Sequence, residues 1–362
     1  MNPNIKLTKE NFHFDYPPEL VATKPVFPRD RSKLLVYQGK KIIDAKFYQI
    51  DGYIPEGSLL ILNNTKVFPS RMHGRTPTGA KVEVFLLECL DSTLNCWSAI
   101  GKPLRKMRTD QKVLFSEKLE GELEFFENCD EAIFFNVTFN QNYQSLMRWL
   151  AEHGNTPLPP YIKRATFSEE EDRANYQTIF AQHHGSVAAP TASLHFTEDV
   201  FENLKKRSIE IQCVTLHVGA GTFLPVKNSN IAEHTMHFEN YCVPPETWKA
   251  VEKAKSDKRP IIAAGTTSFR SLTDYYEKMK SSDTPCGDFL TTNLFIFPKF
   301  HTDVFHSELF SGIITNFHQP ESTLIMLISA LIGFEERKRI YDHAIANQYR
   351  LFSFGDASLL FF

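Results

Sequence analysis

The sequence lacks several features that would assign it to common classes of protein. No apolar run in its 362 residues approaches the length of a membrane-spanning helix, and the start, MNPNIKLTKENFHFDY, lacks the apolar core of a signal peptide. The net charge of −3 is not that of a strongly basic nucleic-acid coat protein, although it leaves room for a local basic patch. The six cysteines show no CxxC or Cys–His spacing, so we interpret them as thiols of a reducing compartment. Together these absences predict a soluble, cytoplasmic protein.

Several catalytic signatures are also missing or incomplete. No GxSxG motif marks a serine nucleophile. His234 and His237 are three residues apart, but no HExxH motif or cysteine pair supports them, so we expect no metal site. The segment VGAGTF (218–223) begins like a dinucleotide fingerprint, but Leu224 occupies the third glycine position and Pro225 follows where the helix should continue. The alternatives are a Gly-rich loop close to an adenosine or ribose and a tight turn with no ligand.

A change in hydrophobic period divides the chain. Between Leu59 and Thr138, short strand-like segments follow one another at roughly ten-residue spacing with no helical pattern between them, which predicts a small antiparallel β-barrel. A short helix, residues 143–153, ends at Gly154, and the Pro-rich stretch TPLPPYIKR reads as a stiff linker. We predict a mixed α/β main domain, residues 1–64 and 159–362, with an antiparallel β-barrel domain, residues 65–158, inserted after its first strand.

After the linker, helical and strand patterns alternate, which is typical of an α/β domain. The expected helices are 198–206, 245–255, 266–280, 323–332 and 338–347, and the expected strands are 210–217, 260–265, 294–297, 312–315 and 351–354.

Polar residues and glycines are dense between His183 and Glu239. This segment holds five further histidines, which are His184, His195, His217, His234 and His237. Histidines close to an acid are typical of a pocket that moves protons. ITNFHQPEST adds His318 at another strand-to-helix turn, although a lone histidine is more often structural. GTTSFR places Thr266, Thr267 and Ser268 at a helix start, either as an anion site or as ordinary N-capping.

Basic residues form a second group of candidates. Lys66, Arg71 and Arg75 fall in NNTKVFPSRMHGR, and Arg164 follows the linker near Tyr161. We interpret these segments as loops that grip a nucleic-acid backbone and stack a base. The alternative is a solvated, charged surface.

The order of the motifs carries a resemblance that runs nearly end to end. It begins with FDYPPELVATKP and RDRSKLLV, continues through PLPPYIKR, YQTIFAQHHGSVAAPTASLHFT, VTLHVGAGTFLPV and GTTSFRSL, and ends with GIITNFHQPESTLIMLISA and YRLFSFGDASLL. The chain closely resembles the S-adenosylmethionine:tRNA ribosyltransferase-isomerase family of queuosine biosynthesis. The resemblance implies that S-adenosylmethionine is consumed as a ribosyl donor, with no metal or other cofactor. The resemblance also implies that the acceptor is 7-aminomethyl-7-deazaguanine at the wobble position of a tRNA and that the products are epoxyqueuosine-tRNA, adenine and methionine.

On the basis of that resemblance, we assign hypothetical roles to three groups of residues. The proton carriers and their orienting acid are His195, His217, His234, His237, Glu239 and His318. The donor is held by Gly219, Gly221, Thr222, Thr266, Thr267, Ser268 and Asp356. The tRNA is held by Lys66, Arg71, Arg75, Tyr161 and Arg164. We expect a monomer. Two alternatives stay open, an S-adenosylmethionine-dependent tRNA methyltransferase and a non-catalytic RNA-binding protein.

Overall fold

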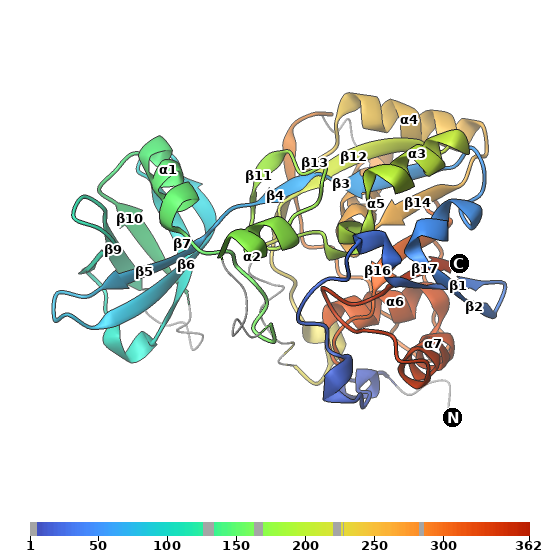
Figure 1. Cartoon of the computed structure of the whole chain (residues 1–362), viewed down its shortest axis with the longest axis horizontal. Coiled ribbons are helices and arrows are strands. Elements are labelled where there is room, and N and C mark those ends of the chain that lie inside the picture. The colour runs from blue at the N-terminus through green and yellow to red at the C-terminus, as the bar shows by residue number, and fades with distance from the viewer. Residues whose placement is uncertain (1–5, 126–133, 163–168, 220–225, 227, 282–285) are drawn as a thin grey trace.

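The computed structural model describes residues 6–125, 134–162, 169–219, 226, 228–281 and 286–362. Within them the chain forms a large domain built on a nine-stranded sheet and a smaller closed barrel of six strands (Figure 1). The barrel is inserted between strands of the large sheet, which confirms the predicted fold class. No helix in the described residues is both long and apolar enough to cross a membrane.

The large sheet has the order β15-β13-β12-β3-β14-β16-β17-β1-β2. Its strands are β1 (Lys33–Gln38), β2 (Lys41–Lys46), β3 (Leu59–Asn63), β12 (Glu210–Leu216), β13 (Glu239–Cys242), β14 (Ile261–Ala264), β15 (Phe289–Thr292), β16 (Gly312–Asn316) and β17 (Ala357–Phe361). The four central strands β12, β3, β14 and β16 are parallel. Strand β17 is antiparallel to β16 and parallel to β1. The carboxyl ends of four strands therefore meet at one edge of the sheet.

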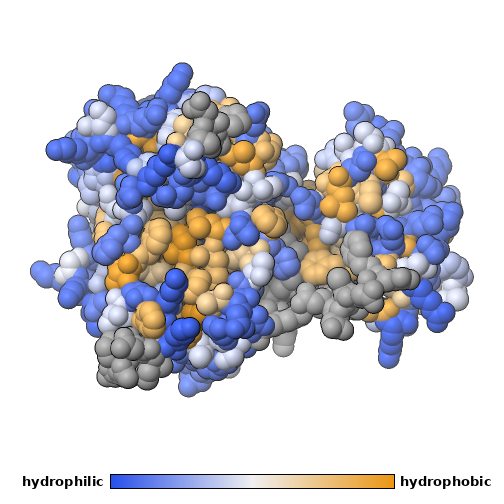
Figure 2. All heavy atoms as spheres, turned by 180° about the vertical axis from the view of Figure 1, so that it is seen from behind, coloured by the Kyte–Doolittle hydropathy of each residue, from blue (hydrophilic) through white to orange (hydrophobic). Residues whose placement is uncertain are grey.

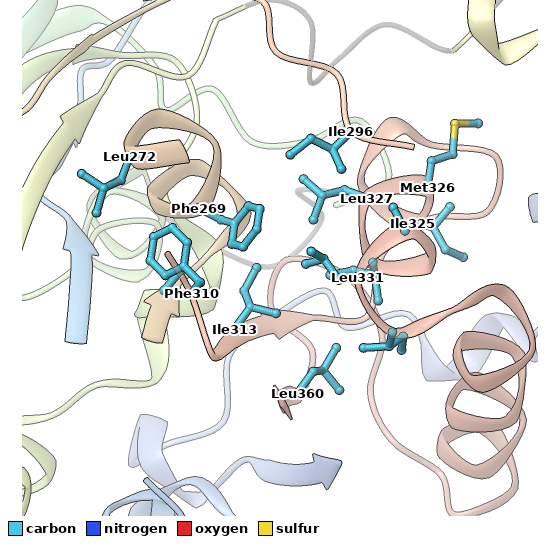
Figure 3. Close-up of a cluster of buried hydrophobic side chains, with 14 of the residues drawn as sticks. Phe269, Leu272, Ile296, Phe310, Ile313, Ile325, Met326, Leu327, Leu331 and Leu360 are labelled. Carbon is cyan, nitrogen blue, oxygen red and sulfur yellow. The ribbon is translucent and has the colours of Figure 1, made fainter. Parts of the chain in front are cut away.

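Successive side chains of a strand point to opposite sides of a sheet, so apolar residues of this sheet lie on both of its faces. Helices cover each of these faces. Leu59 and Ile61 of β3 belong to one core cluster, and Leu60 and Leu62 belong to the other. The first cluster packs under α4 (Pro245–Ser256), α5 (Thr266–Ser281), α6 (Thr323–Ile332) and α7 (Phe334–Ala346), and the second packs under α3 (Glu198–Lys206). Figure 3 shows side chains of α5, β16 and α6 directed toward one another in the first cluster.

The barrel has the order β10-β7-β6-β5-β8-β9. Its strands are β5 (Arg71–Arg75), β6 (Lys81–Asp91), β7 (Cys96–Lys102), β8 (Gln111–Leu114), β9 (Glu120–Phe125) and β10 (Phe134–Phe139). Helix α1 (Tyr143–His153) adds Leu146 and Leu150 to the barrel core. Gly154 caps this helix as predicted, at φ −71°. Its role is steric, because a Cβ there would overlap the carbonyl oxygen of Pro69.

The remaining elements link the two bodies or lie on one of them. A two-stranded sheet pairs β4 (Thr65–Val67) with β11 (His183–Ser186), and α2 (Glu169–Asn175) follows the proline-rich segment. Short 3₁₀ helices occupy Lys9–Phe12, Pro18–Leu20, Arg29–Arg31, Phe47–Gly52, Leu104–Lys106, Thr191–His195 and Ile231–Glu233.

Several local predictions are wrong. Strands β1 and β2 precede β3, so the barrel follows the third strand of the sheet and not the first. The apolar run 294–297 is not a strand, because its side chains pack on the core from an irregular segment. The segment 351–354 contributes a single bridge, Val21 to Leu351, and the closing strand is β17. Helix α7 begins at Phe334, four residues before the predicted start. The predicted domain limits stay a prediction.

Candidate active site

A cavity of ≈ 540 Å³ lies at the carboxyl ends of the central strands, where open α/β sheets commonly bind ligands. Residues that follow three of these strands line it, with Val218 after β12, Thr266 after β14 and His318 after β16. Other lining residues come from distant segments, including Tyr16, Tyr161, Pro190, Met236, His237, Glu239, Phe352 and Ser353. Seen from behind, the larger domain carries an apolar recess with polar side chains around it (Figure 2).

The first turn of α5 forms one wall of the cavity. Gly265 joins β14 to the helix at φ +92°, a conformation that favours glycine. The side chains of Thr266 and Thr267 then line the cavity. The first N–H groups of a helix have no partner inside it, and the helix dipole makes this end attractive to anions. The hydroxyl of Thr267 is buried and has no hydrogen-bond partner among the described residues. The first turn of α5 therefore faces the cavity, and anion binding at this wall stays a prediction.

A buried ion pair joins β13 to α5 beside that wall. Arg270 Nη1 donates to Glu239 Oε2 at 2.5 Å, and both side chains are 6% exposed. Arg270 Nε donates to the carbonyl oxygen of Leu294, and Glu239 Oε1 accepts from the N–H of Gly219 at 3.3 Å. Glu239 thus orients an arginine, where we had expected it to orient a histidine. Both members of the pair line the cavity.

His318 lines the cavity from the end of β16. Its Nε2 is 2.8 Å from Thr315 Oγ1, and its backbone N–H donates to the hydroxyl of Tyr341 at 2.9 Å. Burial lowers the pKa of His318 to about 3, because a charged imidazole would lose its hydration there. The ring is therefore neutral at physiological pH. It can form hydrogen bonds with a ligand, but it is a weak base.

His237 is the second predicted histidine that lines the cavity. It is exposed, and its ring centroid lies 6.1 Å from that of Phe134 on barrel strand β10. His237 therefore sits where the cavity opens toward the barrel.

The other candidate histidines lie outside the cavity lining. His195 is buried behind it, where Nδ1 is 2.9 Å from Ser32 Oγ and Nε2 accepts from Asn316 Nδ2 at 3.5 Å. Burial lowers its pKa to about 4. His217 bonds Thr65 Oγ1 and stacks on Phe289, and burial also lowers its pKa to about 4.

His234 packs edge-on against Phe295, and burial lowers the pKa of this histidine as well. His184 is exposed on β11. The histidine cluster of the sequence is thus spread over several environments, and of the five histidines predicted as proton carriers, His237 and His318 line the cavity.

Two predicted donor-binding residues have structural contacts instead. Asp356 is 1% exposed, and its two oxygens accept from the backbone N–H groups of Lys33 and Arg350, both at 2.8 Å. Ser268 is fully buried and donates to the carbonyl oxygen of Ala264. Gly219 lies next to the cavity through its bond to Glu239. Gly221, Thr222 and Leu224 lie outside the described residues.

The predicted tRNA-binding residues that the structure describes lie on different elements of the fold. Lys66 lies half-buried on β4, and Arg71 and Arg75 lie on β5, so they belong to strands where we had expected loops. Arg71 donates to the carbonyl oxygen of Leu158 at 2.9 Å, and exposed Arg75 donates to Gly79.

Tyr161 lines the cavity and donates to Ser353 Oγ at 2.5 Å. It thereby joins the cavity wall, whereas we had grouped it with the tRNA contacts. Arg164 lies outside the described residues.

Sequence reasoning missed Arg270. This residue follows Phe269 in GTTSFR and is 5% exposed. A charged residue beside the apolar positions of an amphipathic helix was the available signal, because such a charge needs a buried partner.

Comparison with known proteins gives the family. A family model described as "Queuosine biosynthesis protein" matches residues 9–360. The chain belongs to this family. A relative from Treponema denticola is 39% identical over 98% of this chain and 99% of its own length, and one from Thermosipho melanesiensis is 42% identical over 96% and 98%. Both are named S-adenosylmethionine:tRNA ribosyltransferase-isomerase.

A solved structure supports the same assignment. The S-adenosylmethionine tRNA ribosyltransferase from Thermotoga maritima has a TM-score of 0.52 and 29% identity, and it covers 97% of this chain and 99% of its own. These findings confirm the family that the motifs predicted and, with it, an enzyme of the ribosyltransferase-isomerase class.

Proposed function

We propose that this enzyme transfers and isomerises the ribosyl group of S-adenosylmethionine onto 7-aminomethyl-7-deazaguanine at the wobble position of a tRNA. The products are epoxyqueuosine-tRNA, adenine and methionine. The observation that carries the proposal is the full-length match to relatives named for this reaction class. The cavity supports it, because its volume and mixed polar and apolar lining suit a small polar donor. The cytoplasm, where tRNA is modified, is the compartment we propose, and we keep the expectation of a monomer.

The chemistry needs proton transfer and a site that excludes water. The positive sulfonium acidifies the adjacent ribose carbon, so a base starts the reaction by removing that proton. Adenine then leaves and takes up a proton, and the amine of the acceptor base bonds to the carbon that adenine left while losing a proton. The bond from that carbon to the ring oxygen breaks, and the deprotonated carbon uses its electron pair to bond to the same carbon. The freed oxygen then closes the epoxide at the carbon that carries sulfur, which breaks the carbon–sulfur bond and releases methionine. A group that accepts a proton and returns one satisfies both steps.

We assign the proton transfers to His237. It lines the cavity at the opening toward the barrel, where an acceptor base bound to both domains would enter. His318 acts as a neutral hydrogen-bonding group, because its pKa of about 3 makes it a weak base. Thr266 and Thr267 hold the donor at the first turn of α5.

His195 does not line the cavity, and in this proposal it acts on the donor site through Asn316. Its Nε2 accepts from Asn316, whose Oδ1 accepts from Thr191 at 2.8 Å, and both of these partners line the cavity. The neutral ring therefore fixes the orientation of the Asn316 amide. His195 is a positioning residue in this proposal.

The tRNA is shared between the two domains in this proposal. Asn240 on β13 donates to Glu88 on barrel strand β6 at 2.7 Å, so the two bodies are in contact next to the cavity. Half-buried Lys66 on β4 and exposed Arg75 on the barrel are kept as candidate contacts to the tRNA phosphates.

The test is a product assay with S-adenosylmethionine and tRNA that carries the aminomethyl-deazaguanine base. Adenine and methionine released together with epoxyqueuosine in the digested tRNA support the proposal. Release of S-adenosylhomocysteine assigns the chain to the methyltransferases instead. Binding of the tRNA without turnover of the donor leaves a non-catalytic RNA-binding protein.

Variants test the assignment of the base. His237→Gln should lower kcat at least 100-fold, the usual scale for loss of a general acid–base group, with donor affinity unchanged. The matched control is His234→Gln, three residues earlier and outside the cavity, which should keep kcat within a few-fold of the wild-type value. Equal losses in both variants would remove His237 as the base.

A further inference from the structure

Within the part of the chain that the structure describes, two buried polar atoms on one wall of the cavity have no hydrogen-bond partner. Nη2 of Arg270 and Oγ1 of Thr267 make no hydrogen bond, although Arg270 is 5% exposed. A buried guanidinium N–H without an acceptor is costly, so native structures rarely keep one. Both residues line the cavity. The unused hydrogen-bonding capacity of these two residues therefore lies at the cavity wall.

The position of these atoms on the helix points to a negative ligand group. Thr267 and Arg270 are three residues apart on α5, which puts them on one side of the helix. Long helical side chains lean toward the N-terminus, so the guanidinium lies over the first turn. That turn offers free N–H groups and the positive end of the dipole of a 16-residue helix. An arginine N–H pair and a hydroxyl at such a place match a carboxylate.

A negative group is present at the same wall. Glu239 lines the cavity at 6% exposure and holds Arg270 Nη1 at 2.5 Å. Each carboxylate oxygen can accept more than one hydrogen bond, so both oxygens of Glu239 retain capacity beyond Gly219 and Arg270. A second carboxylate alone would leave this buried site with a net negative charge, which is unfavourable. A ligand that brings an ammonium with its carboxylate keeps the site neutral.

We propose that Thr267, Arg270 and Glu239 form a subsite for the zwitterionic α-amino-acid group of the donor. This inference rests on the proposed function, because the methionine part of S-adenosylmethionine is that group. Thr267 and Arg270 Nη2 bind the carboxylate, and Glu239 accepts from the ammonium. The released methionine carries the same two groups, so it occupies the same subsite and inhibits by competition with the donor.

The experiment measures binding without turnover, by calorimetry, with three probes. These are S-adenosylmethionine, its decarboxylated analogue (which keeps the ammonium) and L-methionine. The wild-type enzyme should bind the decarboxylated analogue about 10- to 100-fold more weakly than S-adenosylmethionine, the scale of a charge-assisted pair. Arg270→Gln should weaken the binding of S-adenosylmethionine by a similar factor and leave the affinity for the decarboxylated analogue within about threefold of the wild-type value. L-methionine should compete with the donor in the wild type and not in Arg270→Gln.

Two further variants complete the test. Arg259→Gln is the matched control, because Arg259 pairs with Glu210 at 2.8 Å away from the cavity lining, and it should change no affinity. Thr267→Val removes only the hydroxyl and should reduce the preference for the carboxylate severalfold. Thr267→Val also tests the subsite if the Arg270→Gln variant does not fold.

The results that overturn the inference are distinct from those that overturn the proposed function. Equal affinity of the wild type for S-adenosylmethionine and its decarboxylated analogue would refute the subsite. So would an Arg270→Gln variant that folds and weakens both ligands equally, because Arg270 would then act only on structure. A wild-type enzyme that discriminates between the ligands but releases no adenine would refute the proposed function and leave the subsite standing.

Discussion

The stability of the larger domain should fall in acid because His195 stays neutral when it is folded. Its pKa is lowered from 6.5 to about 4 by burial, whereas the unfolded chain has the ordinary value. At pH 5 the unfolded chain is almost fully protonated at this site and the folded chain is not. Lower pH therefore favours unfolding, and the stabilisation present above pH 6.5 is lost as the pH falls toward 4. The difference between pH 7.5 and pH 5.0 is about 2 kcal/mol for this one residue.

His195→Asn isolates this contribution. The amide can replace Nδ1 in the bond to Ser32 Oγ, but it does not titrate. The free energy of unfolding, from urea denaturation at each pH, should fall between pH 7.5 and pH 5.0 by about 2 kcal/mol less in the variant than in the wild type. Hydrogen exchange of peptides from β14 and β16 reads the larger domain separately from the barrel. Equal losses in the two proteins would show that His195 is not held neutral.

Two other predictions concern packing and buried polar groups. Gly154→Ala should destabilise the barrel by about 3 kcal/mol in thermal denaturation, because the new Cβ would overlap the carbonyl oxygen of Pro69. Gly52→Ala, with no atom within 4 Å of its Cβ, should change stability by less than about 1 kcal/mol, and an equal shift in both would contradict the steric explanation. Asp356→Asn should cost about 2 kcal/mol of unfolding free energy, because an amide N–H would face a backbone N–H, while donor affinity measured by calorimetry stays unchanged. If Asp356→Asn instead lost affinity for the donor but kept wild-type stability, Asp356 would belong to the donor-binding residues.

The barrel was predictable because it depends on local patterns. Alternating apolar residues and turn-rich connectors report antiparallel strands directly. The hairpin of β1 and β2 was missed, since β2 is an edge strand whose side chains are mostly exposed and show no apolar alternation. The apolar run 294–297 was misread because burial alone does not distinguish a strand from an irregular segment that packs on the core.

The site was predictable as a set of loops but not as a set of contacts. His217 and Glu239 are close in the sequence, yet they separate because β13 alternates its side chains. The N–H of His217 bonds to the carbonyl oxygen of Asn240, the neighbour of Glu239, so Glu239 points to the opposite side of the sheet toward Arg270. That partner lies 31 residues further along the chain. Only the order of the strands in the sheet brings the two together.

The pairing of β1 with β17 determines the order in which the two domains can fold while the chain is being synthesised. Strand β17 lies between β16 and β1 in the sheet, so β1 and β2 reach the other strands only through it. The bond from Lys33 to Asp356 spans 323 residues. At 5 to 20 residues per second, the first hairpin waits roughly 15 to 65 s for its neighbour to leave the ribosome. The barrel, made in between from consecutive segments, is complete long before the sheet that carries it. The nascent chain therefore leaves the edge of β1 without its partner strand for most of its synthesis, and unpaired strand edges of this kind are prone to aggregation.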